Sequence, residues 1–121
     1  MSYILLQDYD GQWDSVEDLM KAAATSAGLT KWEMEDELDG GEGRPVPVIH
    51  GTYKKKEVTI AQGPMRAPVN YQAYVVVTRT LREMRIKGGG YNDFRTQEIS
   101  NRLTSAGFSV FIWDTSIPWV G

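Results

Sequence analysis

The chain has 121 residues, of which 41% are hydrophobic and 24% charged, and its formal net charge is −3. This length and apolar content suffice for a hydrophobic core, so we expect one domain spanning residues 1–121. The sequence has no cysteine, which excludes a disulfide framework, a thiolate metal site and a cysteine nucleophile.

The amino-terminal residues lack the pattern of a secretory signal, and no apolar run is long enough to span a membrane. We therefore expect a cytoplasmic protein that does not bind membranes. The charges are unevenly distributed along the chain. Residues 1–50 carry eleven acidic against three basic groups, a net −8, and residues 51–121 carry five against ten, a net +5. Such halves can attract each other, neighbouring copies or two different partners.

In chain order, the apolar run 2–9 predicts a first strand, and residues 14–28 predict a helix. Asp14 or Ser15 can cap this helix, and Gly28 is its expected end. Residues 29–47 are ambiguous, because Trp32 and Met34 alternate as in a strand whereas the acidic run after them could continue as a helix.

Residues 46–80 are rich in β-branched and aromatic side chains and predict successive antiparallel strands, interrupted at Gly51, Gly63, Pro64 and Pro68. Residues 81–87 are compatible with a bent strand or with a helical turn. Residues 91–107 predict a second helix, which Asn92 and Asp93 can cap and whose inner side holds Phe94, Ile99, Leu103 and Ala106. Residues 108–115 predict a last strand.

The segment TSAGLT at 25–30 recurs as TSAGFS at 104–109, which indicates two equivalent helix ends. The order of strand, helix, strands, helix and strand predicts an α+β fold, an antiparallel sheet with both helices packed on one face. A ferredoxin-like (split β-α-β) arrangement with one or two extra strands is the expected topology.

The strongest candidate for a ligand site is a glycine-rich stretch that leads into the second helix. Backbone amides and the positive end of a helix favour an anion there, and several basic residues surround the glycines in sequence. The spacing matches no established nucleotide-binding motif, so a mobile basic loop is the alternative. The predicted ligand residues are Arg82, Arg85, Lys87, Gly88, Gly89, Gly90, Asn92, Asp93 and Arg95.

Aromatic and acidic residues supply candidates for a protein interface. Four tryptophans are many for a chain of this size, and aromatic side chains are enriched at interface hot spots. The acidic run at 33–42 lacks calcium-loop spacing but could contact a basic partner. The predicted partner-binding residues are Trp32, Glu35, Asp36, Trp113 and Trp119.

Residues for catalysis are few. His50 is the single histidine and lies in a strand-like run, and no serine stands in a nucleophile elbow. We therefore expect no enzyme, no metal and no cofactor. The stretch GTYKKKEV forms a basic ribbon near several tyrosines, but the negative net charge makes nucleic acid an unlikely partner.

These features favour a non-enzymatic binding protein, a stoichiometric inhibitor or adaptor. It would bind a protein partner through its polarised charge and exposed aromatic residues. We also expect self-association into a homo-oligomer. One alternative is a protein that sequesters a small phosphorylated ligand or nucleotide at the glycine-rich stretch. Another is a structural subunit of a larger assembly.

Overall fold

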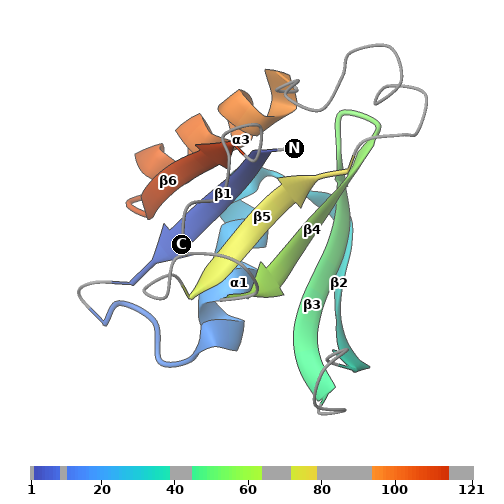
Figure 1. Cartoon of the computed structure of the whole chain (residues 1–121), viewed down its shortest axis with the longest axis vertical. Helices are drawn as coiled ribbons and strands as arrows, with labels where there is room; N and C mark the ends of the chain where they lie inside the picture. Colours follow the sequence, from blue (N-terminus) through green and yellow to red (C-terminus); the bar gives the residue numbers. More distant parts are fainter. Residues whose placement is uncertain (1, 9–10, 39–44, 64–71, 79–93, 115–121) are drawn as a thin grey trace.

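The fold was analysed in a computed structural model, which describes residues 2–8, 11–38, 45–63, 72–78 and 94–114 (Figure 1). The elements in chain order are β1 (Ser2–Gln7), α1 (Val16–Ala27), β2 (Thr30–Leu38), β3 (Pro45–Tyr53), β4 (Lys56–Gln62), β5 (Ala73–Val77), α3 (Phe94–Ser105) and β6 (Ser109–Asp114). The expected α+β class is therefore confirmed.

The strands form one six-stranded sheet in the order β2-β3-β4-β5-β1-β6, and every neighbouring pair is antiparallel. In chain order, α1 lies between β1 and β2, and β2 is an edge strand of the sheet. Helix α3 lies between β5 and β6, the two strands that flank β1 in the sheet. The two helices contact each other and pack on the same core (Figure 1). The sheet and the two helices are as expected, whereas six strands in this order do not establish the specific ferredoxin-like topology.

The core lies between the helices and one face of the sheet. Buried residues alternate along β4 and β5, whereas Ile4, Leu5 and Leu6 of β1 are all buried. Ile4 and Leu6 of β1, Val58 and Ile60 of β4, and Val75 of β5 are all essentially inaccessible to solvent. The helices contribute a matching set of buried side chains, Leu19, Met20, Ala23, Ala24, Ala27, Ile99 and Leu103. Burial of these side chains gives the main driving force for folding.

Helix α1 begins and ends as predicted. The Ser15 hydroxyl accepts a hydrogen bond from the Asp18 backbone N–H, which satisfies one of the free amides at the start of the helix. Gly28 adopts the left-handed conformation at φ +76°, and the Leu29 backbone N–H donates to the Ala24 carbonyl.

The ambiguous acidic segment forms a strand, β2, which pairs with β3. The predicted interruption at Gly51 is wrong, since Gly51 lies inside β3. A Cβ atom at Gly51 would be 2.8 Å from the Trp32 Cβ and 3.3 Å from Leu29 side-chain atoms. The glycine is needed for close approach of neighbouring chain segments and not for a turn.

Helix α3 buries Ile99 and Leu103 as expected. The prediction is wrong for Phe94, which is 53% exposed, and for Ala106, which is also exposed. Phe94 lies in the first turn of the helix, on the side where it meets the β3–β4 turn and not the core. The possible caps Asn92 and Asp93, and the residues 81–87, lie outside the described residues.

Within the described parts of the chain, no helix is long and apolar enough to cross a membrane.

Candidate functional site

Strand β2 is an edge of the sheet and carries a row of glutamates on one face. Glu33, Glu35 and Glu37 alternate along the strand, point away from the helices and are exposed; we call these three residues the acidic face. Successive side chains of a strand point to opposite sides, so every second residue shares a face. Residues Glu35 and Asp36, both predicted to bind a partner, are exposed on the two opposite faces of this strand.

The face also holds the only histidine. The His50 Nε2 atom lies 2.6 Å from Glu37 Oε1, and its Nδ1 atom lies 3.6 Å from Glu57 Oε1 on β4. The Thr59 hydroxyl is 3.4 Å from Nδ1. His50, on β3, thus links β2 to β4, which is a structural role. Within the described residues, neither Glu33 nor Glu35 forms an ion pair.

A basic surface lies at the opposite end of β2, where the β3–β4 turn meets α3. It comprises Lys31, Lys54, Lys55, Arg95 and Arg102, which we call the basic pole. Lys31 is the second residue of β2 and lies near the turn, because its neighbour Thr30 pairs with Thr52. The sequence predicted only Arg95 of this group as a site residue, although the run of three lysines was a visible signal.

The turn at the basic pole has an uncommon backbone. Lys54 and Lys55 have φ values of +44° and +68°, as required at both central residues of a tight two-residue hairpin turn. Glycine, which has no Cβ atom, or asparagine, whose short side chain can hydrogen-bond locally, normally occupies such positions. For other residues the left-handed conformation is unfavourable by about 1–2 kcal/mol per residue. Contacts with α3 must offset this cost.

Those contacts involve the backbone and side chain of Lys54. The Arg95 Nε–H donates to the Lys54 carbonyl at 2.9 Å, and the Lys54 ammonium donates to Glu98 Oε2 at 2.8 Å. The Tyr53 hydroxyl is 3.4 Å from the same carboxylate oxygen. The hydrogen bond from Lys54, the largest effect, lowers the pKa of Glu98 below its ordinary value, so the carboxylate stays ionised to complete the contact.

At the basic pole, cationic side chains lie against two aromatic rings, those of Phe94 and Tyr53. The Arg95 guanidinium lies 4.5 Å and the Lys54 ammonium 5.8 Å from the centroid of Phe94. Arg102 lies 5.8 Å from the centroid of Tyr53. Cations within about 6 Å of a ring face are attracted to it. Phe94 is nevertheless 53% exposed, so a large part of its surface faces solvent.

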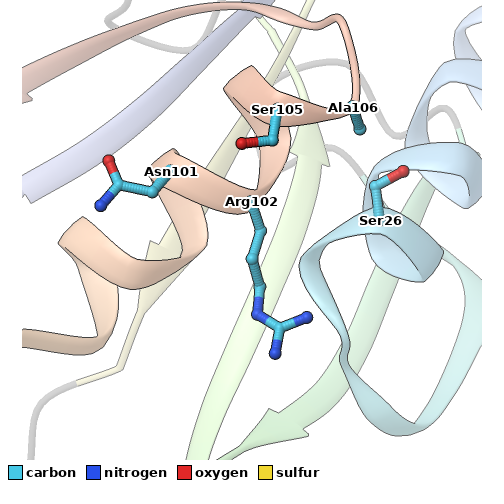
Figure 2. A pocket seen from close by; sticks show the side chains of 5 residues that line it. All are labelled: Ser26, Asn101, Arg102, Ser105 and Ala106. Atoms are coloured by element: carbon cyan, nitrogen blue, oxygen red, sulfur yellow. The ribbon is translucent and has the colours of Figure 1, made fainter.

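A shallow groove lies between α1 and α3, lined by Ser26, Asn101, Arg102, Ser105 and Ala106 (Figure 2). Arg102 extends along it towards the end of α1. A Cβ atom at Gly28 would be 3.0 Å from Arg102 Nη1, so the guanidinium packs over the carboxy-terminal end of that helix. A cation stabilises this negative end of the helix dipole, which gives Arg102 a structural role in the groove.

Most of the predicted ligand residues fall outside the described part of the chain: Arg82, Arg85, Lys87, Gly88, Gly89, Gly90, Asn92 and Asp93. Arg95 lies in the first turn of α3 and contacts the β3–β4 turn. Among the predicted partner residues, Trp32 is half-buried and packs against the core. The backbone of Trp113, in β6, pairs with Tyr3 of β1. The side chain of Trp113 and the whole of Trp119 lie outside the described residues.

In the described ranges, no group of three or more histidine, aspartate or glutamate side chains is arranged to hold a metal ion. The chain was compared with models of known protein families, with curated proteins and with solved structures, and it matches none of them.

Proposed function

We propose that the protein is a non-enzymatic binding protein, an inhibitor or adaptor, that contacts a basic protein surface through its acidic face. The observation that supports the proposal is the exposed row of Glu33, Glu35 and Glu37 on the edge strand β2. Complementary charge of this kind speeds encounter with a partner and selects against wrong ones.

The charges on β2 disfavour pairing of this edge strand with β2 of a second copy of the chain. If two β2 strands paired antiparallel around Glu35, Glu33 would lie opposite Glu37, and Glu35 opposite its own copy. Like charges directly opposite each other destabilise such a pairing. The same glutamates would attract lysine or arginine side chains, so the acidic face suits a basic partner and disfavours this form of self-association.

The test uses the double variant Glu33→Gln and Glu35→Gln, which removes two charges and leaves the Glu37–His50 pair in place. The control, Asp14→Asn with Asp18→Asn, makes the same charge change at exposed positions near the start of α1. Immobilised proteins would be exposed to a lysate of the native cell, and retained proteins would be quantified by mass spectrometry and then titrated in purified form.

Exposed ion pairs contribute about 0.2–1 kcal/mol each, so we expect the partner to bind roughly 2- to 30-fold more weakly to the glutamine variant. The wild type and the control should bind alike. Equal retention of the partner by the glutamine variant would contradict a role for the acidic face.

Two finer features belong to the same proposal. We propose that the fold is an enlarged ferredoxin-like arrangement, because α3 joins two strands that flank β1 as a split β-α-β unit does. We also propose that the protein acts in the cytoplasm.

A further inference from the structure

The backbone conformation sets the basic pole apart from the rest of the described chain. Among the described residues, the non-glycine residues with positive φ are Lys31, Lys54 and Lys55, and all three lie at the same end of the sheet. Unfavourable backbone conformations cluster at functional sites because the surrounding structure has to maintain them. Here they place exposed ammonium groups around one turn and one edge of the sheet.

The same end of the sheet offers an aromatic surface with cations beside it. Phe94 is half exposed, and Arg95 lies 4.5 Å from its ring centroid. Proteins that bind single-stranded nucleic acids combine such rings, on which bases stack, with cations that contact the phosphates. Phe94 is the one large apolar side chain at the pole that is described as exposed, which is little for a protein interface, where several aromatic residues usually form a buried centre.

The negative net charge of the chain argues against nucleic acid only if the charges mix on the surface. In the fold, Lys31 comes before the acidic face along β2. Lys54 and Lys55 of the β3–β4 turn lie at the same end of the sheet as Lys31. At physiological salt, exposed charges more than about 8 Å apart are largely screened from each other. At about 3.3 Å per residue along β2, Glu35 and Glu37 lie beyond this distance from Lys31, whereas Glu33 lies within it, so a phosphate at the turn is screened from most of the acidic face. Of the carboxylates beside the turn, Glu98 is bonded to Lys54, and Glu57 lies two residues beyond Lys55 on β4, near His50.

We propose that the basic pole binds single-stranded nucleic acid. Lys31 and Lys55 contact backbone phosphates, and a base stacks on the surface formed by Phe94 and the Arg95 guanidinium. A base within a duplex cannot reach this ring without leaving its stack, which is why the single strand is favoured. The proposal does not depend on the acidic face and stands or falls separately from the proposed function.

The test measures binding affinity by fluorescence anisotropy at 50 and 200 mM salt. The probes are a labelled oligothymidylate of about twelve nucleotides and a labelled duplex of the same length. For the two phosphate contacts of Lys31 and Lys55 on a single strand, log K should fall with log salt at a slope of about −1.4, so affinity should drop roughly 7-fold between these conditions. The duplex should bind more weakly than the single strand.

The variants separate charge from stacking. Lys55→Gln removes one of the two phosphate contacts and should reduce the drop between the two salt concentrations to roughly 3-fold. Phe94→Ala should weaken binding about fivefold or more without changing the salt slope. Lys21→Gln on α1 is the matched control, an exposed lysine outside the pole, and should behave as the wild type. Circular dichroism would show that each variant is folded.

Four results would overturn the proposal. These are absence of oligothymidylate binding at 50 mM salt, an equal loss of binding in Lys21→Gln and Lys55→Gln, unchanged affinity in Phe94→Ala, and equal or tighter binding of the duplex. Competition by polyglutamate as effective as that by unlabelled oligothymidylate would also overturn it, since the pole would then be a site for acidic protein segments.

Discussion

Replacing Lys55 by glycine should stabilise the protein, although it removes an exposed side chain. Lys55 has φ +68°, a conformation that costs a residue with a Cβ atom about 1–2 kcal/mol. Glycine adopts it without this cost but gains freedom in the unfolded chain, which opposes folding by roughly 0.5–1 kcal/mol. The expected net gain is about 0.5–1 kcal/mol, or about 2–4 °C in Tm for a domain of this size.

The matched control is Lys55→Ala, which removes the same charge but keeps the Cβ atom and therefore the strain. Urea unfolding followed by circular dichroism would give the free energy of unfolding of the wild type and both variants. We expect the alanine variant to lie within about 0.5 kcal/mol of the wild type. We also expect the glycine variant to be about 1 kcal/mol more stable than the alanine variant.

The two variants should lose oligonucleotide affinity to the same extent, because both lack the ammonium group. If the glycine variant were no more stable than the alanine variant, the turn would not carry the strain inferred from its backbone. If only one of them lost affinity, the charge of Lys55 would not be the cause. Lys54 is not suitable for this experiment, since its side chain also holds Glu98.

Three further predictions concern the core, the turn contact and the sheet. Gly51→Ala should destabilise the protein by about 1–3 kcal/mol in urea unfolding, because the new methyl group would meet the Trp32 Cβ at 2.8 Å; an unchanged midpoint would contradict this packing. The pKa of Glu98 is lowered in the folded state, chiefly by the hydrogen bond from Lys54, so the stability that its ionised form contributes is present above the ordinary value of 4.5 and is lost as the pH falls through the lowered value. Glu98→Gln should therefore be less stable than the wild type at pH 7 and approach it as the pH falls below 4.5 through the lowered value, and a difference that does not depend on pH would refute the assignment. Burial, together with a smaller effect of a neighbouring tyrosine, raises the pKa of Tyr74 above 10.0, so folding opposes its ionisation and stability should fall as the pH rises beyond that value. Tyr74→Phe should lose less stability than the wild type between pH 9 and 11, and an equal loss in both would count against a buried hydroxyl.

The sequence alone determined the elements whose signals are local. Helix α1 was predictable because Ser15, the apolar positions and Gly28 each act within one or two turns of the chain. The strands β1, β3, β5 and β6 followed from their apolar, β-branched and aromatic composition, and the α+β class followed from their order with the two helices. The accumulation of acidic residues near 33–37 and the run of lysines at 54–56 were also legible in the sequence.

Only the tertiary structure decided what these segments do together. The acidic segment has no clear local preference, and pairing with β3 makes it a strand. Gly51 resembles a turn residue until Trp32 and Leu29 are placed against it, and the true turn carries two lysines in place of the glycine or asparagine that would have announced it. Phe94 was expected on the inner side of its helix but is exposed, where the cations of Lys54 and Arg95 lie beside its ring. The separation of acidic face and basic pole depends on strand order and on contacts more than forty residues apart in sequence, such as that between Lys54 and Arg95. Net charge and local composition contain no information about such contacts. Only the fold brings together the residues that form the acidic face and those that form the basic pole.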